Sequence, residues 1–185
     1  IGIVGLGKIG AHVARIAYGF EMKIFGFDPH PNLELAKKFT VHFVKIEELL
    51  QKSDIITLHL PLNDQTKHLI DAEKIKIIKH GAYIINTSRG GLIETTALVK
   101  ALADNIISGV ALDVLEDEKD IKEELEVLSP NFSKNHLIIN AANNILLKDP
   151  LVIITPHNAF NSKEALERII ETTTKNILAF AKSSP

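Results

Sequence analysis

The chain has 185 residues, of which 45% are hydrophobic and 24% charged, so it can bury one sizeable core and has the composition of an ordinary globular domain rather than of a disordered or fibrous protein. The formal net charge of −2 and the scattered lysines provide no basic stripe, which argues against nucleic acid as the main partner. The sequence has no cysteine, which excludes disulfides and thiolate catalysis, and no apolar run of about 18 residues that would cross a membrane. It also shows no basic leader followed by a cleavage site, and we expect a cytoplasmic protein.

Short aliphatic runs alternate with segments of helical period along most of the chain. The alternation predicts an α/β fold with a doubly wound parallel sheet. The runs lack polar alternation, so we expect both faces of the sheet to be covered, as parallel sheets require. The expected strands are Ile1–Val4, Lys23–Phe27, Ile55–Leu58, Ala82–Asn86, Ser108–Leu112 and Val152–Ile154.

Two helical segments carry their large apolar residues on one face, and both faces are expected to pack into the core. A final helix is expected at about 162–182, with Asn161 as its N-cap and Glu164 completing a capping box. The apolar faces consist of Ile9, Val13, Ile16 and Phe20 in the first segment, and of Leu166, Ile169, Ile170, Ile177 and Leu178 in the last.

The stretch at about 116–150 differs from the rest of the chain. It is acidic at first and then contains Pro130, an Asn-rich run and Pro150, which predicts a loop-rich insertion with one or two short helices. No repeat or glycine-rich linker divides the chain, so residues 1–185 are interpreted as one domain. The chain opens directly on a strand of buried type, which suggests a piece of a longer protein.

A glycine-rich turn, Gly5-Leu6-Gly7-Lys8-Ile9-Gly10, follows the first strand and opens a helical segment. Gly5 permits the tight turn, Gly7 lets a pyrophosphate approach the backbone, and Gly10 allows helix and strand to pack closely. Asp28 ends the second strand about 20 residues later, where a carboxylate can accept hydrogen bonds from the ribose hydroxyls. A 2′-phosphate would meet like charge there, so the turn predicts NAD rather than NADP. The alternative is a plain glycine turn with an unrelated Asp.

Further motifs follow the glycine turn in order: His59-Leu60-Pro61, Asn-Thr-Ser-Arg-Gly-Gly at 86–91, Gly-Val-Ala-Leu-Asp-Val-Leu-Glu-Asp-Glu at 109–118, and Thr-Pro-His-Asn-Ala-Phe at 155–160. Together they resemble the signatures of the D-isomer-specific 2-hydroxyacid dehydrogenases, and the resemblance covers essentially the whole chain. It implies the NAD-binding Rossmann domain of that family. The long segment at 119–150 resembles the D-lactate dehydrogenase-like branch.

The resemblance implies hydride transfer between NAD(H) and a D-2-hydroxy acid or 2-keto acid of the lactate/pyruvate type. Arg89 suits the substrate carboxylate because its planar guanidinium offers two parallel hydrogen bonds. His157 suits proton exchange with the substrate oxygen, since an ordinary histidine titrates at about 6.5. Glu118 would orient and charge-pair the imidazole. It lies five residues after Asp113, as in the family, whereas Glu116 does not fit that register; Lys119 follows where the family commonly has Pro.

The resemblance also implies how the cofactor is held. Asp113 is expected beside the nicotinamide carboxamide, and the backbone amides of Lys8 and Ile9 beside the pyrophosphate. The remaining histidines match no metal-ligand spacing, so no metal site is expected. The walls of the cofactor cleft are expected to include His59, Leu60, Pro61, Thr87 and Ser88.

In this family a separate substrate domain forms from an N-terminal segment and the tail, and it is expected to be largely absent from this chain. We therefore expect the chain to bind NAD(H) but to turn over 2-keto acids poorly. The implied partners are the small-molecule acid, the substrate domain and a second copy in a homodimer. The alternatives are an NAD-responsive regulatory or corepressor-like binding protein, an enzyme for formate or phosphite, and a structural scaffold. Glu118 argues against formate, whose related enzymes place Gln beside the His.

Overall fold

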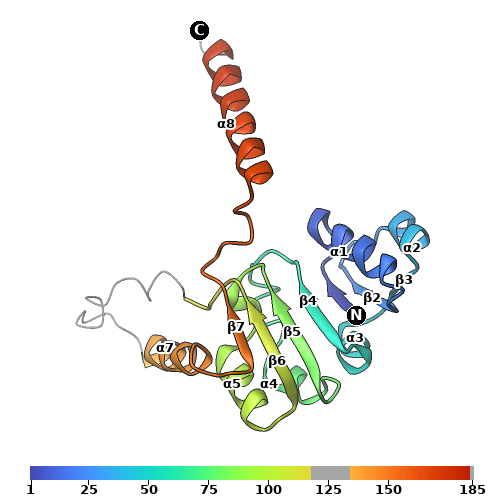
Figure 1. The fold of residues 1–185 in the computed structure, drawn as a ribbon, viewed down its shortest axis with the longest axis vertical. Coiled ribbons are helices and arrows are strands. Elements are labelled where there is room, and N and C mark those ends of the chain that lie inside the picture. The colour runs from blue at the N-terminus through green and yellow to red at the C-terminus, as the bar shows by residue number, and fades with distance from the viewer. Residues whose placement is uncertain (118–133, 184–185) are drawn as a thin grey trace.

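The computed structural model describes residues 1–117 and 134–183. Its strands form one parallel sheet in the order β3-β2-β1-β4-β5-β6-β7 (Figure 1). β1 pairs with β2 on one side and with β4 on the other, so the direction in which successive strands are added across the sheet reverses at β1, and the sheet is doubly wound, as predicted. The strands are β1 (Gly2–Val4), β2 (Ile24–Phe27), β3 (Val41–Phe43), β4 (Ile55–Leu58), β5 (Ala82–Asn86), β6 (Ile107–Leu112) and β7 (Val152–Ile154).

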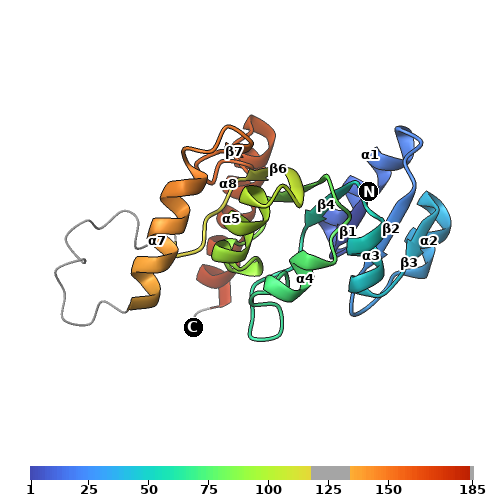
Figure 2. The ribbon, with the colours of Figure 1, turned by 90° about the horizontal axis from the view of Figure 1, so that it is seen from below.

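The helices occupy both sides of this sheet. α1 lies on one side, and α3 and α4 lie on the other (Figure 2). α7 falls within the stretch expected to be loop-rich, of which residues 118–133 lie outside the described part. The helical segments are α1 (Lys8–Gly19), α2 (Leu33–Phe39), α3 (Ile46–Lys52), α4 (Ala72–Lys76), the 3-10 turn η1 (Gly90–Leu92), α5 (Thr95–Ala103), α7 (Lys134–Leu146) and α8 (Lys163–Ser183).

The core-facing side of α1 differs from the prediction. The helix buries its small residues Gly10, Ala14 and Ala17 against the sheet. Ile9, Ile16 and Phe20, which were expected in the core, are exposed. The reason is the close approach of helix and sheet: a Cβ added to Gly10 would lie 2.0 Å from the carbonyl oxygen of Gly5. Large side chains cannot occupy so narrow a gap, so they face outward.

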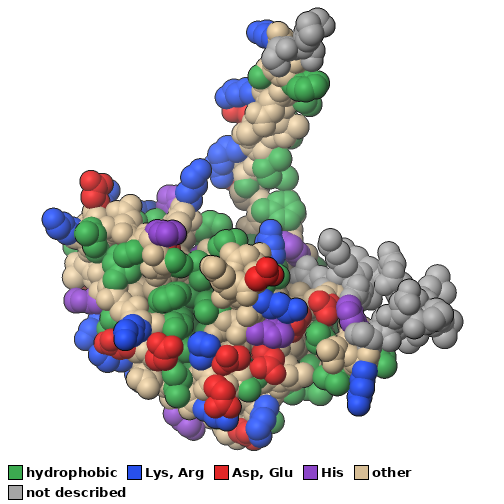
Figure 3. All heavy atoms as spheres, turned by 180° about the vertical axis from the view of Figure 1, so that it is seen from behind, with side chains coloured by type: hydrophobic (Ala, Val, Ile, Leu, Met, Phe, Trp, Pro, Cys, Tyr) green, Lys and Arg blue, Asp and Glu red, His purple; other side chains and the backbone are tan. Residues whose placement is uncertain are grey.

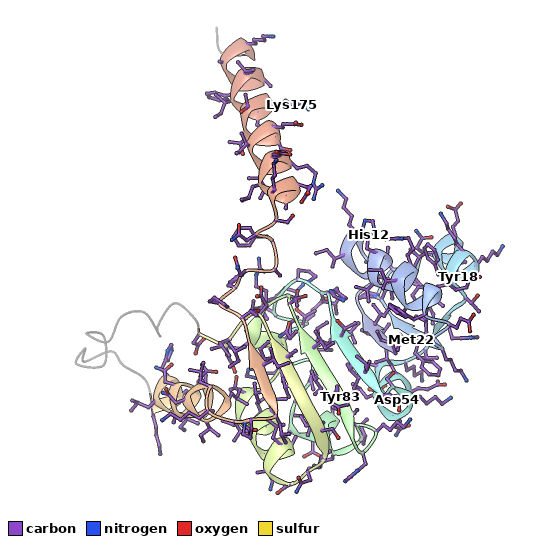
Figure 4. The ribbon with its side chains drawn as sticks, viewed as in Figure 1. His12, Tyr18, Met22, Asp54, Tyr83 and Lys175 are labelled. Atoms are coloured by element: carbon purple, nitrogen blue, oxygen red, sulfur yellow. The ribbon has the colours of Figure 1, made fainter. Side chains whose placement is uncertain are left out.

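Coverage of the sheet is also less complete than predicted. A large hydrophobic cluster fills the space between the sheet and α3, α4 and α5. In Figure 1, however, the near face of β5, β6 and β7 carries no helix from the described residues. Tyr83 of β5, labelled in Figure 4, and Ile153 of β7 are both exposed on strands whose other residues are more buried. The expectation of two covered faces therefore holds only in part.

The last helix, α8, extends away from the body of the domain, as both the ribbon and the space-filling view show (Figures 1 and 3). Its apolar residues, among them Ile170, Ile177 and Phe180, are exposed, so the predicted core stripe of this helix is not buried in the described structure. Its N-cap also differs from the prediction by one residue. The hydroxyl of Ser162, not the side chain of Asn161, accepts a hydrogen bond from the amide of Ala165.

No helix within the described ranges has both the length and the hydrophobicity that a membrane span requires.

Candidate active site

The glycine turn connects β1 to α1 in a conformation that only glycine can adopt readily. Gly5 has φ +93°, and a Cβ there would lie 2.8 Å from the backbone carbon of His59. Gly7 is the N-cap of α1, no side chain caps this end, and no described atom lies within 4 Å of where its Cβ would be. The N-terminus of α1, which includes the amides of Lys8 and Ile9, therefore has no side-chain cap, and the backbone at Gly7 is open, which fits an anion such as a pyrophosphate.

Asp28 lies beside this turn, directly after β2. Its Oδ2 accepts a hydrogen bond from the amide of Leu6 at 2.7 Å, and its Oδ1 accepts one from the amide of His30 at 2.8 Å. These two contacts hold the carboxylate at the carboxyl end of β2, next to the phosphate-binding turn. The predicted proximity of Asp28 and the glycine turn is thus present in the structure.

The segment His59-Leu60-Pro61 leaves β4 next to β1, where the amide of His59 donates to the carbonyl of Val4. The ring Nε2 of His59 lies 3.0 Å from the hydroxyl of Thr57, and burial lowers the pKa of the ring below its ordinary value. The hydroxyl of Ser88 donates to the carbonyl of Leu60 at 2.6 Å, which joins the ends of β4 and β5. The structure therefore places three of the predicted motifs side by side at the carboxyl edge of the sheet.

Arg89 and His157 line one cavity of about 440 Å³ at the same edge. Arg89 is exposed, and its guanidinium donates to the carbonyl of Ser88 at 2.7 Å. His157 is also exposed and has φ +53°. Lys67 lines the same cavity, although no motif in the sequence pointed to it. The cavity holds a group suited to a carboxylate and a group suited to proton transfer.

Asp113 anchors the backbone that carries His157. Its Oδ1 accepts hydrogen bonds from the hydroxyl of Thr155 and the amide of Asn158, and its Oδ2 accepts one from the amide of Ala159. Burial alone would raise the pKa of Asp113, but these hydrogen bonds, together with the charge of His157, hold it below its ordinary value. Sequence reasoning assigned Asp113 to the cofactor and gave no sign of this anchoring role.

The two candidate acids near the end of β6 differ in their surroundings. Glu118 lies outside the described residues. Glu116 is only 6% exposed, and its carboxylate accepts hydrogen bonds from the amide and hydroxyl of Thr95 and from the ring of His68. These bonds hold Glu116 in place; the choice of Glu118 as the acid beside His157 stays a prediction from the register of the motif.

Comparison with known proteins defines the class to which this fold and site belong. The family model described as "D-isomer specific 2-hydroxyacid dehydrogenase, NAD binding domain" matches residues 1–159. The chain belongs to this family, and its cofactor is NAD.

Among its relatives is the 2-hydroxyacid dehydrogenase homolog 1 of Schizosaccharomyces pombe, which is 40% identical over 185 residues, or 100% of this chain and 53% of the relative. The D-specific alpha-keto acid dehydrogenase of Enterococcus faecium is 40% identical over 182 residues, or 98% of this chain and 52% of the relative. The solved D-lactate dehydrogenase of Aquifex aeolicus, complexed with NAD and lactic acid, matches with a TM-score of 0.86 and 36% sequence identity. The match covers 98% of this chain and 53% of the chain of that dehydrogenase. The chain thus spans about half the length of the proteins it matches.

Proposed function

We propose that the protein catalyses hydride transfer between NAD(H) and a D-2-hydroxy acid or its 2-keto acid, of the lactate/pyruvate type. The observation that carries this proposal is the cavity lined by both Arg89 and His157, at the carboxyl edge of the sheet that also carries the predicted cofactor turn. A carboxylate and a proton-exchanging oxygen on adjacent carbons are the two features common to such substrates. The similarity to a D-lactate dehydrogenase complexed with NAD and lactic acid supports the same choice.

NAD(H), when bound, supplies or takes up the hydride. In our proposal the residues around the glycine turn bind its pyrophosphate, and Asp28 accepts hydrogen bonds from its ribose hydroxyls. The residues His59, Leu60, Pro61, Thr87, Ser88 and Asp113 form the walls of its cleft. Arg89 binds the substrate carboxylate through paired hydrogen bonds. His157 donates a proton to the keto oxygen during reduction and removes it during oxidation, and Glu118 favours the protonated imidazole.

We further propose the surroundings in which this domain works. Residues 1–185 form one domain, and α8 leads toward a substrate domain. The protein is a homodimer, because members of the resembled family commonly dimerise through this domain. Its location is the cytoplasm. Light scattering on the purified protein measures the oligomeric state, and cell fractionation measures the location.

The test of the catalytic proposal is His157→Ala in the full-length protein. We expect the rate of pyruvate-dependent NADH oxidation to fall by about a hundredfold or more, since general acid catalysis contributes factors of that order. NADH affinity should be unchanged, because His157 is assigned to the substrate and not to the cofactor. If turnover is unchanged, or if the unsubstituted protein binds NADH and reduces no 2-keto acid, the regulatory binding protein becomes the better description.

A further inference from the structure

A hydrogen-bonded cluster at the cavity that Arg89 and His157 line has no role in the proposed reaction. It consists of Glu116, Thr95 and His68, which come from three separate segments of the chain. Oε2 of Glu116 accepts hydrogen bonds from the hydroxyl of Thr95 at 2.7 Å and from its amide at 3.3 Å. The ring Nε2 of His68 donates to Oε1 at 2.6 Å, since a carboxylate can only accept.

This cluster binds the segment 89–95 at two points, Gly91 and Thr95, and we call these two attachments the clamp. At its far end, Thr95 is bound by Glu116 as described above. Nearer Arg89, the amide of His68 donates to the carbonyl of Gly91 at 2.8 Å. His68 therefore holds Gly91 with its backbone and Glu116 with its side chain. It does so from a left-handed backbone conformation, φ +49°, which is uncommon outside glycine but which asparagine, aspartate and histidine adopt more often than other residues.

The same segment packs directly against the backbone of Glu116. A Cβ added to Gly90 would lie 2.1 Å from the carbonyl carbon of Leu115 and 2.2 Å from the amide nitrogen of Glu116. On its other side, the carbonyl of Glu116 accepts a hydrogen bond from the buried amide group of Asn143 in α7. Glu116 is therefore held by Thr95, His68 and Asn143. Gly90, the residue after Arg89, packs against the backbone of Glu116.

We propose that Glu116 and His68 are positioning residues for Arg89, which set the affinity for the carboxylate of the substrate by holding the segment that carries Arg89 and not by binding the carboxylate themselves. This inference rests on the proposed function and names a further requirement of the same site. A guanidinium binds a carboxylate through two parallel hydrogen bonds only when its backbone is held in place. A clamp at Gly91 and Thr95 supplies that restraint for an arginine whose own side chain is exposed.

The clamp acts on substrate binding more than on the chemical step or on the cofactor. His157 lies on a different segment, which Asp113 anchors. The glycine turn follows β1 and shares none of these contacts. Loosening the clamp should therefore raise KM for the 2-keto acid while kcat and the Kd for NADH change little, which is the signature of lost uniform binding.

The test compares two substitutions of His68 in the full-length protein. The side chain of His68 is 34% exposed, so replacing it is compatible with folding. His68→Asn suits the left-handed backbone, but its amide is too short to reach Glu116 in place of the ring. His68→Gln keeps a longer amide that can donate to the carboxylate. As a matched control, Glu48→Ala breaks an exposed ion pair with Lys52 on α3.

We expect His68→Asn to raise KM for pyruvate about fivefold to tenfold, with kcat and the Kd for NADH within about twofold. Amide hydrogen exchange at 89–95 should become faster in the same variant, and His68→Gln should restore most of both effects. The control should change neither. An unchanged KM in His68→Asn, or equal effects on kcat and on NADH binding, or a failure of His68→Gln to restore KM, overturns the inference.

Failure of the proposed function has a different result. In that case the unsubstituted protein reduces no 2-keto acid, and the inference falls with it because there is no substrate affinity to set. An active unsubstituted protein whose KM is insensitive to His68→Asn leaves the proposed function standing and overturns the positioning role alone.

Discussion

At the level of single residues, the carboxylate of Asp113 determines how the backbone around His157 is held. Substituting Asp113→Asn removes the charge and converts one acceptor oxygen into an amide that cannot accept. At least one of the hydrogen bonds from Thr155, Asn158 and Ala159 is then lost. Because hydrogen bonds to a charged acceptor contribute about 1.5 to 3 kcal/mol each, we expect the free energy of unfolding to fall by about 2 kcal/mol.

The same substitution should change the pH dependence of stability. The fold lowers the pKa of Asp113, so its stabilising contribution is present above the ordinary value of 3.8 and is lost as the pH falls through the folded-state pKa. In Asp113→Asn this acid-side loss should be smaller. Urea unfolding at neutral and acidic pH measures it, with Asp104→Asn as a control in an exposed ion pair. Equal pH dependence in both variants would contradict the assignment.

At the level of elements, substitutions of three glycines in the β1–α1 unit distinguish an effect on folding from an effect on cofactor binding. Gly10→Ala places a Cβ 2.0 Å from the carbonyl oxygen of Gly5, so helix and strand must move apart. Gly7→Ala meets no described atom within 4 Å, but its Cβ occupies the space beside the first-turn amides. Gly19→Ala also meets no described atom within 4 Å, at the opposite end of α1.

We therefore expect three different outcomes. Gly10→Ala should lower the free energy of unfolding by about 1 to 3 kcal/mol and weaken NADH binding. Gly7→Ala should lower the free energy of unfolding by less, about 0.5 to 1 kcal/mol, because alanine is a poorer N-cap than glycine. It should lose about tenfold or more in NADH affinity, because the backbone is no longer open to the phosphates. Gly19→Ala should change neither by much. Thermal unfolding and NADH titration on the three variants measure both quantities, and tight NADH binding by Gly7→Ala would argue against the assigned phosphate site.

The elements also illustrate what sequence reasoning could and could not predict. Central strands such as β4 and β5 were predicted with their observed bounds, because strands with a buried face are continuous aliphatic runs. β3 was missed: it has three residues and a polar His42 at its centre. For α1, helical periodicity correctly grouped the large apolar residues on one face, but periodicity does not tell which face is inward. The close packing of Gly10 decided that.

The site follows the same pattern. Motif order was sufficient to locate Asp28, Arg89 and His157 at one edge of the sheet, because carboxyl ends of parallel strands meet there. The contacts of Asp113 with Thr155 and of Glu116 with His68 span 42 and 48 residues. Such pairs depend on how distant segments pack, and no local pattern encodes them. These supporting contacts were therefore found only in the structure.

At the level of the whole molecule, the residues assigned to cofactor binding and those assigned to turnover lie in different surroundings. The glycine turn and Asp28 are held together within the chain by β1, β2 and α1. Arg89 and His157, in contrast, are both exposed at the edge of their cavity. An exposed pair neither excludes water nor restrains the substrate, and poor positioning alone can cost about a hundredfold in rate.

We therefore expect the 185-residue chain alone to bind NADH with a measurable Kd but to reduce pyruvate far more slowly than the typical enzyme range of about 1 to 1000 per second. Calorimetric titration measures binding, and loss of NADH absorbance measures turnover. The Asp28→Ala chain is the control for binding, because it should weaken NADH affinity while leaving Arg89 and His157 in place. Turnover by the isolated chain within that range would contradict the prediction and mean that the exposed pair is sufficient for catalysis.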